Sequence, residues 1–235
     1  MENELMMNVL FDSYKSYDDW GLLLESIFIS FPSPVENKIS VPGRDGKLDL
    51  SEIVSQITYD EREIKLTFSL VGSYEDWHKR SSHIANAIHG KIVKIILDTD
   101  PGFYYIGRIV LESEKNDDVF ENIVISGTVD PFKYDMEDGT GDWLWDPFSF
   151  EDGIIREYRG IIVNGSKTVI VPGRRKRAMP SITCSAPMEL SCGKITVNLP
   201  VGTTKVYELQ LGEGEHELVF RGKGIVSISY RGGSL

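Results

Sequence analysis

Residues Arg62–Leu70 read "REIKLTFSL", and this stretch decides the fold class. Apolar side chains occupy every second position, and charged or hydroxyl-bearing side chains lie between them. A period of two places successive side chains on opposite faces of an extended strand. The stretch therefore predicts a β-strand with one face on a core and the other toward water.

The residues around this strand predict further strands and a single helix. Residues 74–89 carry apolar side chains at a spacing of three to four, and Ser73 can cap the first turn. Gly90 follows as a C-terminal glycine. The other strands expected in this half are Leu22–Ile29, Val35–Val41, Lys91–Leu97, Phe103–Leu111 and Val119–Val129.

The composition shifts at Asp135, where the acidic, aromatic and glycine-rich segment "DMEDGTGDWLWDPFSFEDG" begins. Short strands then recur with turn signals every eight to twelve residues, and Asn164-Gly165 is expected to form a hairpin turn. The strands expected here are Ile161–Asn164, Thr168–Val171, Ser181–Ser185, Lys194–Leu199, Lys205–Leu211, Glu217–Arg221 and Gly224–Tyr230. This rhythm predicts a jelly-roll β-sandwich. We expect a mainly β chain of two domains, residues 1–134 and 135–235.

Charge and composition narrow the function classes. Hydrophobic residues make up 41% of the 235 residues, which is typical of globular proteins. The formal net charge of −11 disfavours nucleic-acid binding, because an acidic surface repels phosphate. The acidic N-terminus differs from a signal peptide, and no apolar run reaches the length that spans a bilayer. We expect synthesis in a cytoplasm and no membrane insertion.

Catalytic, cofactor and metal sites are not indicated. The sequence contains no nucleophile elbow, Walker loop or dinucleotide fingerprint. Asp98-Thr99-Asp100 is interpreted as turn chemistry before Pro101-Gly102, and Cys184 and Cys192 as small buried thiols. The basic run Arg174–Arg177 is expected to form a charged loop that faces an acidic neighbour. We therefore predict a protein that is not an enzyme and takes no cofactor.

The segment "ISVPGRDGKLDL", residues 39–50, is the first candidate binding site. Pro42 fixes φ, and Gly43 and Gly46 permit positive φ, so a rigid turn is expected. Arg44 and Asp45 can then pair locally or across a subunit boundary. A surface turn without any partner explains the same residues equally well.

The aromatic cluster of Trp143, Trp145 and Phe148 is the second candidate. On a jelly roll, such side chains can form a platform on which sugars stack. An interdomain plug or an alternating strand core explains the cluster better, so the sugar platform is the minor alternative.

Several motifs occur in an order that resembles a known family. They are "SYDDWGLLL" (16–24), "VPGRDGKLDLSE" (41–52), "REIKLTF" (62–68), "HGK" (89–91), "LDTDPGFYYIGRI" (97–109) and "DPFKY" (130–134). This order is similar to the distal tail proteins of siphophages that infect Gram-positive bacteria. The final segment, "LGEGEHELVFRGKGIVSISYRGGSL" (211–235), resembles the same family more loosely.

The resemblance implies a structural protein of the phage virion or of a prophage. It implies an N-terminal β-sandwich or split barrel with one helix that forms a hexameric ring, and a galectin-like C-terminal sandwich. The ring would be the baseplate hub at the tail tip, joining the tail tube protein to the tip or lysin protein and to receptor-binding proteins. DNA would pass through it only as cargo. The alternative function is a carbohydrate-binding adhesin that recognises host cell-wall glycans.

Overall fold

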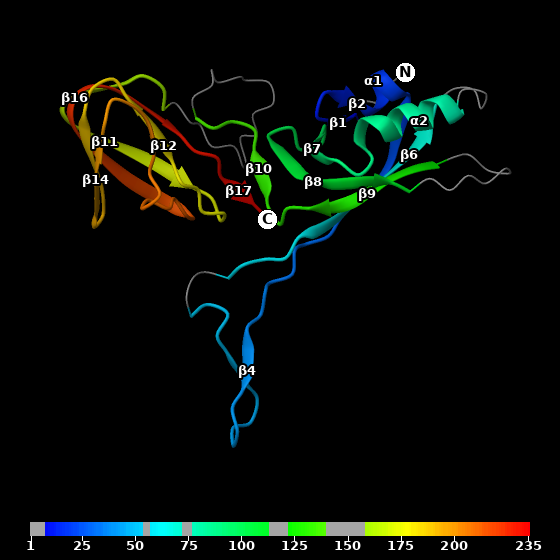
Figure 1. The fold of residues 1–235 in the computed structure, drawn as a ribbon, viewed down its shortest axis with the longest axis horizontal. Helices are drawn as coiled ribbons and strands as arrows, with labels where there is room; N and C mark the ends of the chain where they lie inside the picture. Colours follow the sequence, from blue (N-terminus) through cyan, green and yellow to red (C-terminus); the bar gives the residue numbers. More distant parts are fainter. Residues whose placement is uncertain (1–7, 54–56, 72–76, 113–121, 140–157) are drawn as a thin grey trace, which may run out of the picture. The chain divides into compact units, whose positions relative to one another are not determined.

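The computed structural model describes residues 8–53, 57–71, 77–112, 122–139 and 158–235. The chain divides into two compact units (Figure 1). The first unit contains residues 1–99, 105–131 and 235, and the second contains residues 100–104 and 132–234. No helix within the described ranges has the length and apolar character needed to cross a membrane.

An antiparallel sheet forms the first unit, in the order β2-β1-β7-β8-β9-β6-β3. Its strands are β1 (Val9–Phe11), β2 (Tyr14–Lys15), β3 (Leu22–Ile29), β6 (Arg62–Leu70), β7 (Ile92–Leu97), β8 (Phe103–Leu111) and β9 (Asn122–Val129). Its helices are α1 (Ser16–Trp20) and α2 (Trp77–Ile88). The mainly β fold is confirmed, and β3, β6 and β8 have the bounds that the sequence predicts.

The core of the first unit forms where β6 faces α2. Ile64, Leu66 and Phe68 alternate along β6 and are at most 1% exposed. They belong to one buried cluster with Ile84 and Ile88 of α2. Burying each such side chain contributes about 1.5–3 kcal/mol, so the alternating strand and the helix stabilise each other.

Two glycines permit β8 and β9 to approach closely. Gly107 pairs with Val129, and Gly127 pairs with Ile109. A Cβ atom on Gly127 would lie 2.2 Å from the carbonyl oxygen of Arg108, which is shorter than any real contact. Any larger residue at either glycine would therefore force the two strands apart.

Helix α1 is an element that the sequence reading missed, since it expected only one helix. Its N-terminal amides find acceptors outside the helix: Tyr17 N–H donates to Asn8 Oδ1 at 2.8 Å. Gly21 ends the helix in the left-handed region, and its N–H bonds the Tyr17 carbonyl. Asp18 and Asp19 in the first turn and this glycine were the available signals.

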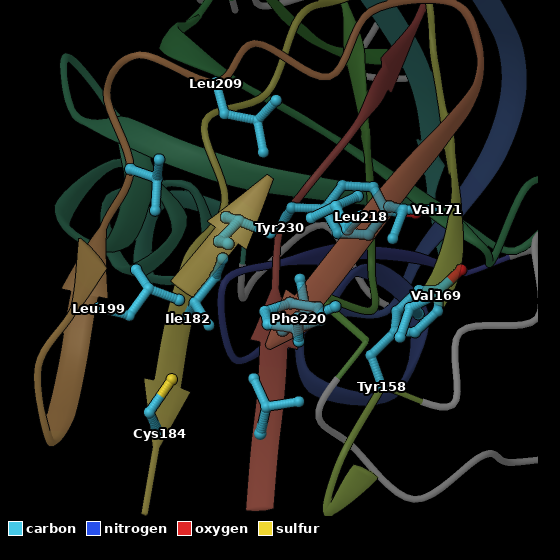
Figure 2. Close-up of a cluster of buried hydrophobic side chains, with 14 of the residues drawn as sticks. Tyr158, Val169, Val171, Ile182, Cys184, Leu199, Leu209, Leu218, Phe220 and Tyr230 are labelled. Atoms are coloured by element: carbon cyan, nitrogen blue, oxygen red, sulfur yellow. The ribbon is translucent and has the colours of Figure 1, made fainter. Parts of the chain in front are cut away.

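A six-stranded antiparallel sheet wraps around the core of the second unit. Its path is β14-β13-β16-β12-β15, and β11 pairs with β16. The strands are β11 (Ile161–Gly173), β12 (Ser181–Cys184), β13 (Met188–Cys192), β14 (Ile195–Leu199), β15 (Gly202–Lys205) and β16 (Gly214–Ser229). Figure 2 shows Leu218 and Phe220 of β16 between Val169 and Val171 of β11 and Ile182 of β12. All strands except β15 contribute to this single core.

Long-range pairing overrides two local predictions in this unit. The expected hairpin at Asn164-Gly165 is wrong: β11 continues through both residues, and Gly165 pairs with Gly222 of β16. The expected strand Lys205–Leu211 is also wrong. β15 ends at Lys205, and beyond it Leu211 makes only an isolated bridge to Ala178.

The short strands β10 (Lys133–Asp135) and β17 (Gly233–Ser234) pair with each other in the second unit, and cations lie over aromatic rings around β10. Arg174 Nε bonds Asp135 Oδ1 at 2.7 Å, with the two side chains only 12% and 5% exposed. The Arg174 guanidinium also lies 4.8 Å from the centre of the Phe103 ring. Asp135 is therefore an acidic neighbour of the basic run. We refer to these two residues as the Asp135–Arg174 pair.

Candidate functional site

The described residues 30–53 and 57–61 form an arm that leaves the first-unit sheet at the end of β3 and returns at the start of β6 (Figure 1). Within it, β4 (Lys38–Ser40) pairs with β5 (Lys47–Asp49) as a separate two-stranded sheet. Nearer the main sheet, Val35 N–H bonds the Thr58 carbonyl at 2.9 Å. The described residues from 33 to 47 are all exposed, so the arm lacks a core of its own.

The motif at residues 42–46 forms the tip of this arm. Arg44 N–H bonds the Val41 carbonyl at 3.2 Å, and Gly43 between them has φ 80°. With Pro42 before Gly43, this is a type II turn. Gly46 has φ 77°. The turn and its positive φ angles are therefore present as expected.

Arg44 and Asp45 are both exposed. No ion pair joins these two described side chains, so a local pair does not form. Their role at a subunit boundary stays a prediction.

Hydrogen bonds fix the other end of the small sheet. Asp49 Oδ1 accepts bonds from the Ser51 hydroxyl at 2.5 Å and the Ser51 amide at 2.9 Å. The Ser51 hydroxyl oxygen in turn accepts the Asn37 amide at 2.8 Å. These bonds lower the pKa of Asp49, and the bond from the Ser51 hydroxyl has a larger effect than the bond from the Ser51 amide. The arm is thus a defined element, although it is exposed.

Large apolar side chains are concentrated on the arm and on the adjoining half of β3. Among the described residues, sixteen large hydrophobic side chains are exposed, and seven of them lie between residues 27 and 53. The seven are Ile27, Phe28, Phe31, Val35, Ile39, Val41 and Ile53, with Phe31 84% and Ile53 71% exposed. Single exposed apolar residues are normal, but a concentration of this kind marks an interaction site.

The free edge of β3 adjoins these side chains. β3 is the last strand of the sheet, and among the described strands it pairs only with β6. An uncovered edge presents backbone N–H and C=O groups that can pair with another chain. We define the assembly surface as the β3 edge together with the seven exposed apolar side chains.

The cavity in the first unit shows no arrangement typical of a catalytic or metal site among its described residues. A cavity of about 810 Å³ lies between α1 and α2, lined by residues that include Asp18, Asp19, Arg80 and His83. Arg80 Nη1 is bound to the Val71 carbonyl at 2.8 Å. Within the described residues, no group of three or more His, Cys, Asp or Glu side chains can hold a metal ion.

The other candidate residues have ordinary structural partners or lie outside the description. Asp98 accepts the Asn8 amide at 2.8 Å, and Asp100 pairs with Lys133 at 2.6 Å. Cys184 and Cys192 are free thiols, and burial raises the pKa of both. The aromatic residues Trp143, Trp145 and Phe148 lie outside the described residues.

Comparisons with known proteins agree with this geometry. The family model of the phage tail protein RIFT-related domain matches residues 16–131. No curated protein sequence matches the chain.

Among solved structures, the chain resembles the Dit protein (gp 19.1) of phage SPP1. The TM-score is 0.64 at 16% sequence identity, over 97% of this chain and 99% of that one. That structure is described as a paradigm of the hub adsorption apparatus in phages that infect Gram-positive bacteria. Residues 16–131 therefore match the phage tail protein RIFT-related domain, and the chain shares the fold of the SPP1 Dit protein over nearly its whole length.

Proposed function

We propose that copies of this protein assemble into a hexameric ring, the hub that joins a siphophage tail tube to the adsorption device. The role is mechanical, and no reaction is catalysed. The exposed apolar arm beside the free β3 edge is the observation that carries the proposal. The description of the SPP1 protein as a hub supports the same position in the tail for this chain.

A closed ring requires two different surfaces on each copy, so that one patch contacts a different patch on the next copy. The assembly surface supplies one of them. The arm extends from β3 without a core, so it can reach a neighbouring subunit. Pro42 and Gly43 hold the tip in one conformation, which lowers the ordering cost of that contact. Arg44 and Asp45 at the tip would then lie at the subunit boundary.

The energies favour a ring over an isolated pair. The seven side chains expose the equivalent of about four whole residues, and covering them would contribute on the order of 5–10 kcal/mol. Association itself costs about 4–15 kcal/mol. A single contact is therefore marginal, whereas closure gives every copy two interfaces. Each stable interface should bury about 1,600 Å² in total.

The acidic charge suits a channel for DNA. Six copies at −11 each carry a formal net charge of −66. A lumen of that sign would repel phosphate and let DNA pass without adhering. The protein would be made in the host cytoplasm and would function at the virion tail tip, in contact with tube, tip and receptor-binding proteins.

Light-scattering mass and negative-stain microscopy of the purified full chain test this proposal. We expect annular particles of about 159 kDa, since six chains of 26.5 kDa make that mass. Phe31→Ser should shift the mass toward 26.5 kDa by removing an 84% exposed contact side chain. Ile162→Ser is the matched control, because Ile162 is 73% exposed on β11, and it should leave the mass unchanged. A ring that forms equally well with Phe31→Ser would refute the assembly surface.

A further inference from the structure

We propose that a groove on the outer face of the second-unit sheet binds a neutral sugar ring of a glycan. Glu189, Asn198 and Arg221 supply its polar groups, and Pro187, Pro200 and Val201 are among the residues that form its walls. This inference is independent of the ring, since none of these residues belongs to the assembly surface.

Strand register places the three polar side chains in one row. Glu189 of β13 pairs with Asn198 of β14 on one side and with Arg221 of β16 on the other. The flanking residues Met188 and Leu190 are buried, so the row lies on the opposite, outer face. Two strand spacings give the row a length of about 10 Å.

An exposed ion pair fixes the middle of the row. Arg221 Nη1 bonds Glu189 Oε1 at 2.8 Å, while the side chains remain 60% and 39% exposed. The structure gives no hydrogen bond to Glu189 Oε2 or to the Asn198 side-chain amide from any described residue. The row therefore presents a carboxylate acceptor, guanidinium donors, and an amide that does both.

Hydroxyl groups match this pattern because each one both donates and accepts. Bonds from hydroxyls to the Glu189 carboxylate or from Arg221 are charge-assisted and therefore stronger than neutral ones. The apolar walls complement the C–H faces of a sugar ring. Val201 is 62% exposed there. The groove has a volume of about 490 Å³, within the usual range for small-ligand sites.

Charge argues for a neutral ligand. Glu189 neutralises Arg221, so the groove has no unpaired cation to attract a phosphate. A hard metal ion needs several oxygen ligands, and the groove holds a single carboxylate. A neutral polyhydroxylated ring fits the donors, the acceptors and the apolar walls together.

Amide chemical-shift titration of the full-length protein tests the proposal. The probes are the methyl glycosides of glucose, galactose and N-acetylglucosamine. We expect at least one glycoside to shift the amides of Glu189, Asn198 and Arg221. Asn198→Ala and Glu189→Ala should each raise Kd by at least about tenfold, because each removes a hydrogen-bonding group at the sugar. Unchanged amide shifts at Leu218 and Phe220 confirm that the core stays folded.

Thr203→Ala is the control, because Thr203 lies on β15 and is not among the residues that line the groove, so the variant should bind like the parent. The proposal is overturned if none of the three glycosides shifts these amides. It is also overturned if binding occurs but survives both groove substitutions, which would place the sugar elsewhere. A stronger response to ribitol phosphate than to ribitol would assign the groove to an anion and overturn it equally.

Discussion

The Asp135–Arg174 pair provides a sharp test of what holds the second unit together. The perturbation is Arg174→Met, which keeps a long apolar side chain and removes the charge. The partner carboxylate is 5% exposed and lies 2.7 Å from the Arg174 Nε that the substitution deletes. The substitution therefore removes the Arg174 charge from beside a buried carboxylate.

The expected loss follows from burial. Removing one partner of a buried ion pair typically costs about 3–5 kcal/mol, because the remaining charge stays desolvated. The lost contact between the guanidinium and the Phe103 ring, at 4.8 Å, adds about 0.5–2 kcal/mol. We expect Arg174→Met to lower the free energy of unfolding of the second unit by at least about 3 kcal/mol.

Arg221→Met is the matched control. Arg221 bonds Glu189 at 2.8 Å, nearly the same distance, but its side chain is 60% exposed. Exposed pairs contribute only about 0.2–1 kcal/mol. The two variants thus remove the same chemistry at similar distances and differ mainly in exposure.

Hydrogen exchange of the β16 amides is a suitable assay, since the amides of Leu218 and Phe220 lie in the central strand of this unit. Exchange should accelerate by about two to four orders of magnitude in Arg174→Met. It should accelerate less than about tenfold in Arg221→Met. Equal acceleration in the two variants would refute the reasoning from burial. Adding Asp135→Asn to Arg174→Met should recover part of the loss, because no charge is then left buried.

Three further predictions concern the first unit. Gly127→Ala should destabilise it by about 3 kcal/mol or more, measured as a fall in Tm, because the new Cβ would lie 2.2 Å from the Arg108 carbonyl oxygen; an unchanged Tm would contradict the close approach. Gly43→Ala should cost about 1–2 kcal/mol through its φ of 80° alone, since the site is open, so faster exchange is expected in β4 and β5 only. Folding lowers the pKa of Asp49. The contribution of the ionised Asp49 to folding stability is therefore complete above the unfolded pKa of about 3.9, and it is lost as the pH falls through the folded pKa. The Ser51 amide resonance should therefore titrate below about pH 4, and Asp49→Asn should abolish that titration.

Strict alternation explains which strands the sequence predicts well. β6 matches its expected bounds because it has one buried face and is long enough for the pattern to be unambiguous. β8 is predicted instead by its apolar composition between turn residues. Helix α1 has only five residues, and the amide of Tyr17 bonds Asn8, which lies eight residues before the helix begins. A pattern of period 3.6 cannot be recognised over so short a length.

The failures in the second unit come from pairing between distant residues. Asn-Gly is a strong local signal for a hairpin, but Gly165 is held within a thirteen-residue strand by an unbroken ladder to β16. Val206, Leu209 and Leu211 resemble a strand in the sequence, and they are buried. They close the core from a loop rather than from a strand. In the second place, the local sequence reports burial but not the backbone conformation that achieves it.

The sequence predicts the turn of the candidate site but not the exposure of the apolar residues around it. Pro42, Gly43 and Gly46 define the turn through their own backbone preferences, which are local properties. The burial of Ile39 or Ile53 depends on tertiary contacts, and the local sequence does not determine those contacts. Only the structure shows that these apolar residues, which a pattern assigns to a core, are exposed.

The distribution of exposed apolar side chains separates the roles of the two units. In the second unit, six large apolar side chains are exposed among the described residues of 132–234, and two of them, Ile162 and Ile225, are direct cross-strand partners. In the first unit, seven lie within the 27 residues from 27 to 53, next to an unpaired strand edge. Because hydrophobic association grows with contiguous buried area, covering the larger group in the first unit would contribute more than covering the smaller one in the second. We therefore expect the proposed assembly to act through residues 27–53, leaving the groove on the second-unit sheet free to meet other ligands.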